Sequence, residues 1–355
     1  EASYCVVSNT TAAFRGNNTT TASAPVCLGV GTKLRNSLVT RNSRFRVEHS
    51  RKASAGVKVV GDDVLIEDCT ISHNTANQHS NTYLQSGATG LLIYGKATVR
   101  RTQICNNTTY VNGNANTDEI AGVCVAVESH LENCLISGNK VTTTSEAGNS
   151  RCAGLYLIAK ASIVNCTICG NYVDEKVNFT THGVYANTTE ALAITNSIIY
   201  GNGRPQEEFS AINFVSKSKA LTLANNCFGS VDRQNFDNDT CVYATPYDVF
   251  YDDGVYKINS ESICCNKGVE ISGLTSDIDG FARPQGVSFD IGCYEAKIEK
   301  TCSFISLKDN VCKGKKITML GRAAFPDEVV EWLWNIDGQM YTVNESSEIE
   351  IEFKE

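Results

Sequence analysis

Residues 154–171 read GLYLIAKASIVNCTICGN, and recognisable copies of this stretch recur along the chain. The clearest copies occupy residues 56–74, 90–107, 122–139 and 183–202, and weaker copies occupy residues 26–42 and 211–230. The asparagine that closes a copy stands at positions 42, 74, 107, 139, 171 and 202, which gives a period of 31 to 33 residues. Self-similarity at such a period is typical of solenoids, in which each repeat forms one coil.

Columns of similar side chains appear when positions are counted back from the closing asparagine. Three positions back stand Val39, Ile71, Ile104, Ile136, Ile168 and Ile199, and eight positions back stand Leu34, Ile66, Val99, Leu131, Ile163 and Ile194. Five positions back stand the small residues Ser37, Cys69, Thr102, Cys134, Cys166 and Ser197. Because residues two apart share one face of a strand, we predict that the columns at three and five point inward together.

A polar residue interrupts the apolar columns six positions back from the closing asparagine. The residues at this place are Asn36, Asp68, Arg101, Asn133, Asn165 and Asn196. Asparagine tolerates a left-handed backbone and bonds its own main chain, so this column predicts a bend between two strands. We expect stacked coils to place these amides above one another, in a hydrogen-bonded ladder.

The repeats show no helical periodicity and are rich in β-branched residues, with a glycine at the start of each clear copy. Short strands separated by bends predict an all-β fold, a right-handed parallel β-helix of six to seven coils with ~32-residue repeats. We assign residues 1–25 to an N-terminal cap, 26–230 to the β-helix, 231–297 to a C-terminal cap and 298–355 to a partial β-sandwich. The polar residues between copies are expected to project as insertion loops on one side, where solenoids place binding surfaces.

Composition restricts the classes of function. The chain has 355 residues and a net charge of -8, which argues against general nucleic-acid binding. No apolar run reaches the roughly 18 residues of a membrane helix, and residues 1–10 lack the pattern of a signal peptide. Sixteen cysteines without zinc-type spacing favour an oxidising setting, outside the cell or at its surface, over an intracellular one. In that setting we expect the chain to be a mature product or a fragment.

The cysteines are interpreted first as packing residues. Cys166 and Cys169 are three apart in a strand pattern, so they are expected to point to opposite faces rather than to form a redox or metal pair. A disulfide between the stacked Cys134 and Cys166 stays open, because neighbouring coils bring Cα atoms to about 5 Å. The first candidate for a disulfide is Cys302 with Cys312, ten residues apart in the C-terminal tail.

The repeat, with Ile-x-x-Asn at its end and Gly-aliphatic at its start, resembles exported bacterial right-handed β-helix proteins, and loosely the polymorphic outer-membrane proteins. Residues 277–295 read DIDGFARPQGVSFDIGCYE and resemble the ending of β-helix proteins with a choice-of-anchor Q domain. The tail, with WLWNIDG at residues 332–338, resembles PKD-type modules. These resemblances imply an exported, surface-attached protein. Only about 55 residues follow position 300, short of the 80 to 100 of such a sandwich, so we expect the chain to stop inside this module.

Several residues are candidates for a binding site. A basic run could hold an acidic glycan, and aromatic residues of the insertions could stack on sugars. The candidates are Arg44, Arg46, Arg51, Lys52, Tyr83, Tyr110, Tyr172 and Phe179. Solvated loops and loop packing are the alternative interpretations. Asp277, Asp279 and Asp290 beside Arg283 are weak Ca²⁺ candidates and are otherwise structural; no other cofactor is expected.

The first functional hypothesis is a non-enzymatic secreted or cell-surface protein, adhesin-like or glycan-binding, whose partner is a polysaccharide or a host glycoconjugate. The alternative is a β-helix polysaccharide lyase or glycoside hydrolase acting on an acidic polysaccharide. Its usual acids and histidine are represented only by scattered residues such as Asp63, Asp118 and His182, which is a poor match for two carboxylates 5 to 10 Å apart. A passive surface stalk is the third hypothesis.

Overall fold

The structure is a computed structural model. It describes residues 1–15, 24–47, 53–79, 84–112, 117–143, 151–174, 180–204, 213–229, 240–245, 248–251, 256–297, 302–305, 316–323, 331–336, 339–343 and 348–352. The described residues form strands and turns and contain no helix, so none of them forms a helix able to cross a membrane. The chain divides into two compact units, Glu1–Ala296 and Lys297–Glu355.

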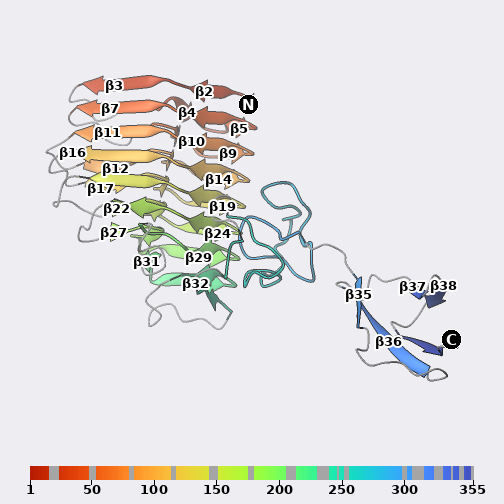
Figure 1. Cartoon of the computed structure of the whole chain (residues 1–355). Helices are drawn as coiled ribbons and strands as arrows, with labels where there is room; N and C mark the ends of the chain where they lie inside the picture. Colours follow the sequence, from red (N-terminus) through yellow and green to blue (C-terminus); the bar gives the residue numbers. More distant parts are fainter. Residues whose placement is uncertain are drawn as a thin grey trace. The chain divides into compact units, whose positions relative to one another are not determined.

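The first unit is a parallel β-solenoid, as the repeat predicts (Figure 1). Three long sheets of described strands run along it, and successive strands of each sheet come from successive repeats. The eight-stranded sheet contains β1 (Ala2–Ser3), β5 (Lys33–Arg35), β9 (Val64–Glu67), β14 (Ala97–Arg100), β19 (Ser129–Glu132), β24 (Ala161–Val164), β29 (Ala191–Thr195) and β32 (Ala220–Ala224).

The nine-stranded sheet contains β2 (Val6–Ser8), β6 (Leu38–Thr40), β10 (Thr70–Ser72), β15 (Gln103–Cys105), β20 (Leu135–Ser137), β25 (Thr167–Cys169), β30 (Ile198–Ile199), β33 (Cys227–Phe228) and β34 (Val242–Tyr243). The seven-stranded sheet contains β4 (Val26–Leu28), β8 (Val57–Val59), β13 (Leu91–Ile93), β18 (Val123–Val125), β23 (Leu155–Leu157), β28 (Val184–Ala186) and β31 (Phe214–Ser216). These three sheets enclose one apolar core.

The predicted inward columns form that core. Ile71, Ile104 and Ile136, three positions back, are fully buried, and so are Ile66 and Val99, eight positions back. The small residues five positions back are buried with them and turn a hydroxyl or thiol onto their own main chain. Thr102 Oγ1 donates to the carbonyl of Arg100 at 2.9 Å, and Cys134 Sγ donates to that of Glu132 at 3.3 Å. Cysteine therefore replaces serine or threonine here as a small buried donor.

The bend column has the predicted left-handed backbone. Asn36, Asp68, Arg101, Asn133, Asn165 and Asn196 have φ between 45° and 54°. The expected amide ladder along this column is mostly wrong, because among these described asparagines a single step is formed, from Asn196 Nδ2 to Asn165 Oδ1 at 3.1 Å.

The continuous ladder is formed instead by the closing asparagines. In each step the backbone amide and Nδ2 of one residue both donate to Oδ1 of the next, from Asn42 through Asn74, Asn107, Asn139 and Asn171 to Asn202 and Asn213. Every one of these side chains is fully buried, so the ladder satisfies amides that would otherwise lack partners.

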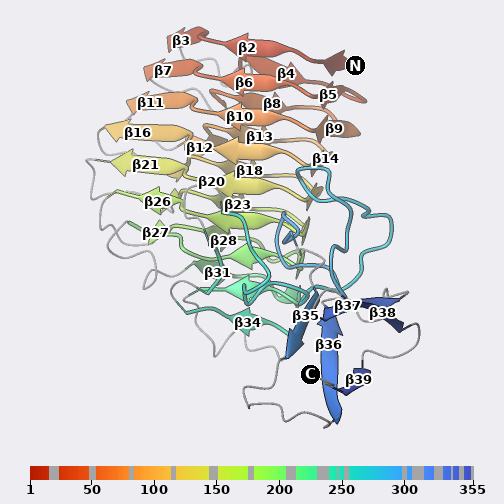
Figure 2. The same cartoon turned by 45° about the vertical axis from the view of Figure 1, so that its right-hand side comes forward.

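The sequences between the copies are in part strands of the coil rather than projecting loops (Figure 2). A six-stranded sheet contains β3 (Thr11–Arg15), β7 (Ser43–Val47), β11 (Thr75–His79), β16 (Thr108–Asn112), β21 (Lys140–Thr143) and β26 (Tyr172–Val173). A four-stranded sheet contains β12 (Leu84–Ala88), β17 (Thr117–Ile120), β22 (Arg151–Cys152) and β27 (Thr180–Thr181). Val111, Val141, Val173, Ala121 and Ala153 fill a small core of their own.

Both ends of the unit differ from simple caps. β1, β2 and β3 pair in parallel with β5, β6 and β7, so residues 2–15 already form a regular coil. Residues 256–296, here called the wrap segment, lie along the bend column of successive coils. The Nδ2 groups of Asn133, Asn165 and Asn196 donate to the carbonyls of Ser276, Asp290 and Val269. These contacts occupy the amide groups of the bend asparagines and explain why the column forms no continuous ladder, although Asn196 also bonds Asn165.

The second unit has two small antiparallel sheets. The first is formed by β35 (Cys302–Ile305), β36 (Lys316–Ala323) and β39 (Glu348–Glu352), and the second by β37 (Trp332–Ile336) and β38 (Gln339–Val343). Trp334 and Ile349 form its small core, with Met319, Trp332 and Tyr341 packed around them. The pair of sheets agrees with the predicted sandwich-like module.

Candidate binding groove

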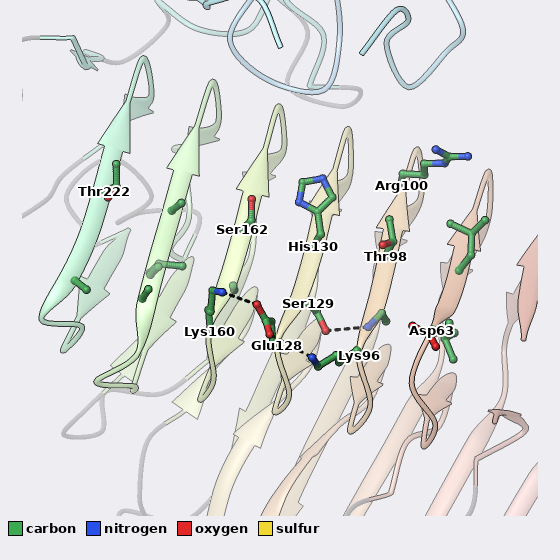
Figure 3. A pocket seen from close by; sticks show the side chains of 18 residues that line it. Asp63, Lys96, Thr98, Arg100, Glu128, Ser129, His130, Lys160, Ser162 and Thr222 are labelled. Atoms are coloured by element: carbon green, nitrogen blue, oxygen red, sulfur yellow. Dashed lines mark hydrogen bonds and ion pairs between the residues drawn. The ribbon is translucent and has the colours of Figure 1, made fainter. Parts of the chain in front are cut away.

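The outer face of the eight-stranded sheet carries an open groove with a volume of about 610 Å³ (Figure 3). Its floor is a row of outward side chains in register on β14, β19, β24, β29 and β32. The row consists of Thr98, His130, Ser162, Ala193 and Thr222. Because strands in a sheet lie 4.7–4.9 Å apart, this row offers one outward side chain every ~4.8 Å along the solenoid axis.

One wall of the groove is a row of charged side chains. Lys96 Nζ lies 3.6 Å from Glu128 Oε2, and Lys160 Nζ lies 2.6 Å from Glu128 Oε1. Figure 3 shows the three side chains on neighbouring coils along one edge of the floor. All three are about half exposed, so water screens these ion pairs and leaves both ammonium groups available to a ligand.

The opposite wall carries Arg100, and a buried carboxylate holds it in place. Glu67 is 5% exposed and accepts a hydrogen bond from Arg100 Nε and another from Arg101 Nη2. Arg35 Nε lies 3.0 Å from the other oxygen of Glu67. Burial raises the pKa of Glu67, but the hydrogen bonds and charges of the two arginines outweigh it, and the pKa falls below its usual value.

Glu128 in the groove and Glu132 beside His130 are poor proton donors. The hydrogen bond from Lys160 holds the pKa of Glu128 below its usual value. The contact with His130, whose Nε2 lies 3.4 Å from Glu132 Oε2, lowers the pKa of Glu132 against the effect of burial. A glycosidase needs one carboxyl group with a raised pKa as its general acid. The pKa values of Glu128 and Glu132 are lowered instead, so these two carboxyl groups suit binding better than glycoside hydrolysis.

Of the four predicted basic candidates, the structure describes the side chain of Arg44 alone, and that side chain is buried. The side chain of Arg44 is 1% exposed on the inward face of β7, level with the buried Ala76 of β11. It therefore cannot reach a ligand on the outer surface. Arg46 lies in β7 with a side chain outside the described set, and Arg51 and Lys52 lie outside the described residues.

Two of the predicted aromatic residues lie on the six-stranded sheet. Tyr110 of β16 is exposed, and Tyr172 of β26 is half-buried beneath Lys140, whose Nζ lies 5.1 Å from the ring centroid. Tyr83 and Phe179 lie outside the described residues. Neither Tyr110 nor Tyr172 lines the groove.

The three Ca²⁺ candidates are engaged in the wrap segment. Asp277 Oδ1 accepts the backbone amides of Asp279 and Phe281 at 2.9 Å, and Asp279 Oδ2 accepts Lys257 Nζ at 2.6 Å. Asp290 is buried and accepts the backbone amides of Asn266 and Ala296, each at 2.6 Å. No group of three or more His, Cys, Asp or Glu side chains in the described part of the chain could hold a metal ion.

Arg283 joins the wrap segment to the solenoid. Its guanidinium pairs with Glu295, both side chains being fully buried, and its Nη2 donates to Asn133 Oδ1 at 2.9 Å. The set around Asp277, Asp290 and Arg283 thus attaches this segment to the bend column, which agrees with a structural role.

The side chains of Cys166 and Cys169 point to opposite faces, as predicted. Cys166 lies in the main core, whereas Cys169 packs outside it against Cys293 and Tyr294. Cys134 and Cys166 are free thiols, so the disulfide left open between them is not formed. The predicted Cys302–Cys312 bridge lies outside the described residues, because Cys312 and the side chain of Cys302 are not described.

Sequence reasoning missed the groove, although a signal for it exists. All floor residues except Thr222 stand nine positions before a closing asparagine, next to the inward column at eight, and the charged row stands eleven positions before it. Two columns on the outward side of a strand therefore mark the groove. Their residue types vary from coil to coil, so no single copy of the repeat reveals them.

Comparisons of the chain with protein-family models, with curated proteins and with solved structures found no match. The parallel β-solenoid is shown by the structure itself. The exported location, the choice-of-anchor ending and the PKD-type module stay predictions that rest on the sequence.

Proposed function

We propose that this protein is a non-enzymatic glycan-binding protein of the cell exterior and that an extended acidic polysaccharide lies along the groove. The observation that carries the proposal is the floor row of Thr98, His130 and Ser162, which repeats once per coil beside Lys96 and Lys160. A repeating row of donors and acceptors is complementary to a repeating polymer, whose successive units can make the same contact on successive coils.

The charges of the groove favour a carboxylated chain. Lys96, Lys160 and Arg100 border the floor, and their hydrogen-bond donors suit carboxylate groups. The existing ion pairs of Lys96 and Lys160 with Glu128 are exposed and weak, so a polymer carboxylate competes with them at small cost. The openness of the site suits a long chain better than a small molecule, which needs an enclosing pocket.

The test is affinity electrophoresis in native gels that contain polygalacturonate. We expect the protein to be retarded, and the double variant Lys96→Gln/Lys160→Gln to lose affinity by about two- to thirtyfold, since each exposed ion pair contributes ~0.2–1 kcal/mol. Lys140→Gln is the matched control, because Lys140 forms an equivalent ion pair with Asp174 on a different sheet. Equal retardation of the double variant and the control, or no retardation at all, would leave the passive stalk as the better hypothesis.

A second candidate function is a polysaccharide lyase, and one contact favours it. His130 stands in the middle of the floor with Nε2 3.4 Å from Glu132, an arrangement that can orient a general base. A lyase would produce an unsaturated sugar with strong ultraviolet absorbance. We expect no rise in absorbance when the protein is incubated with polygalacturonate. A rise that His130→Ala abolishes would replace the binding proposal with the enzymatic one.

The location can be checked separately. An exported protein that matures in an oxidising compartment is expected to show fewer reactive thiols, after unfolding without reductant, than the sixteen cysteines of its sequence. The count is made with a chromogenic disulfide on protein isolated from its native source. Sixteen reactive thiols would contradict the oxidising setting and leave the groove proposal untouched.

A further inference from the structure

The outer face of the six-stranded sheet carries two exposed aromatic rings. Phe45 of β7 is 47% exposed and Tyr110 of β16 is 41% exposed. Both are in register with Asn77 of β11, which lies between them. The rings therefore stand two coils apart, or ~9.6 Å at the usual strand spacing, with an amide side chain halfway between them.

The alternation of side chains along a strand directs these three side chains outward. The alternate residues Arg44, Ala76 and Thr109 are buried on the inner face, which leaves their neighbours Phe45, Asn77 and Tyr110 on the outer one. The rings are not members of the buried clusters, so they are not needed to fill a core. The outward row continues through Thr142 to Asp174, and Thr142 Oγ1 lies 3.4 Å from Asp174 Oδ2.

The charges described on this face neutralise one another. Lys140 Nζ lies 2.6 Å from Asp174 Oδ2 and 5.1 Å from the centroid of the Tyr172 ring. Burial lowers the pKa of Lys140, but the hydrogen bonds and charges of these partners outweigh it, so the pKa is raised and the ammonium group stays charged at neutral pH. Charge complementarity therefore favours an uncharged ligand here, in contrast to the groove with its rows of lysine and arginine.

We propose that this face is a second carbohydrate site, which binds an uncharged linear polysaccharide with its chain parallel to the solenoid axis. Pyranose rings stack on Phe45 and Tyr110, because the electron-rich face of an aromatic ring attracts the electropositive C–H groups of a sugar. The two-coil distance between the rings is close to the length of two sugar units in an extended chain. Asn77 provides both a donor and an acceptor for the hydroxyl groups between them.

The experiment is affinity electrophoresis of the whole chain in native gels containing hydroxyethylcellulose, run beside gels containing polygalacturonate. We expect retardation by the neutral polymer, and a fall in affinity of about two- to twelvefold for Phe45→Ala and again for Tyr110→Ala. Tyr110→Phe is expected to bind as well as the parent, because it keeps the ring. Tyr4→Ala removes a ring that is 80% exposed elsewhere on the solenoid, and it should have no effect.

The outcomes separate this site from the groove. Retardation by hydroxyethylcellulose that depends on Phe45 and Tyr110, and not on Lys96 and Lys160, supports the second site even where polygalacturonate fails to bind. If hydroxyethylcellulose does not retard the protein, the second-site proposal is wrong, whether or not polygalacturonate binds. If Tyr110→Ala instead dissociates a dimer in analytical ultracentrifugation, the face binds a second copy of the chain and the carbohydrate proposal is wrong. An unchanged far-UV circular dichroism spectrum of each variant shows that the comparison is made on folded protein.

Discussion

The closing-asparagine ladder should contribute strongly to the stability of the solenoid, and Asn107→Ala is the substitution that tests this. Asn107 is fully buried, and its side chain makes hydrogen bonds in both directions along the ladder. Its Oδ1 accepts from the backbone amide of Asn74 at 3.1 Å and from Asn74 Nδ2 at 3.0 Å. Its Nδ2 donates to the carbonyl of Ile71 and to Asn139 Oδ1, each at 3.0 Å.

The expected loss in free energy of unfolding follows from these contacts. At about 1 kcal/mol net for each hydrogen bond, their removal costs about 4 kcal/mol. Two of the former partners keep another bond, since Asn74 Nδ2 still donates to Val39 and Asn139 Oδ1 still accepts the amide of residue 107. The backbone amide of Asn74 loses its Asn107 acceptor inside the protein, so the loss should not fall below about 2 kcal/mol.

The assay is urea unfolding followed by far-UV circular dichroism. Tryptophan fluorescence is unsuitable, because Trp332 and Trp334 both belong to the second unit. The matched control is Asn106→Gly, since Asn106 is exposed with φ of 57° and the next coil carries Gly138 at this place with φ of 63°. The control should change stability by no more than ~0.5 kcal/mol. If Asn107→Ala were as stable as the control, the ladder would not carry the energy assigned to it.

Three further predictions concern charge, backbone approach and thiols. Because the pKa of Glu67 is lowered, its ion pairs stabilise the fold at pH values above the usual glutamate pKa, and this contribution is lost as the pH falls through the folded-state pKa. Glu67→Gln should therefore flatten the decline in melting temperature between about pH 5 and pH 3. An unchanged slope of melting temperature against pH would contradict this prediction. Gly122→Ala should destabilise the solenoid by about 1–3 kcal/mol in urea unfolding, because a Cβ there would lie 2.3 Å from the carbonyl oxygen of Gly154. Cys27 is exposed, so Cys27→Ser should remove one thiol equivalent from the fast phase of a thiol titration of the folded protein. Burial raises the pKa of the Cys152 thiol to about 12, so Cys152 should react only when the protein unfolds.

The core could be predicted from the sequence because its signal is repeated. A single Ile-x-x-Asn carries little information, but five copies in register favour one structure, with Ile71, Ile104 and Ile136 stacked on the inner face of parallel strands. The same logic placed Cys166 inside and Cys169 outside.

The ladder was assigned to the wrong column because both asparagine columns have the chemistry to form one. What separates them is a contact distant in sequence, since Asn165 Nδ2 bonds the carbonyl of Asp290 and Asn133 bonds Arg283. Neither contact leaves a periodic trace in the sequence. The strands of the insertions were missed for a related reason: Thr75–His79 and Thr108–Asn112 are polar, and their pairing depends on the coil that precedes them.

The two proposed sites share one physical origin. A parallel solenoid repeats each outward position once per coil, so any column of outward residues becomes a linear array along the axis. In the eight-stranded sheet the outward columns carry Lys96, Glu128 and Lys160 beside hydroxyl groups. In the six-stranded sheet they carry Phe45 and Tyr110, with the amide side chain of Asn77 between the two rings. Both arrays suit a polymer with a short repeat, but their charge differs, so they should select different chains. If both proposals hold, we expect the protein to bind an acidic and a neutral polysaccharide at once, because each site uses side chains from a separate sheet.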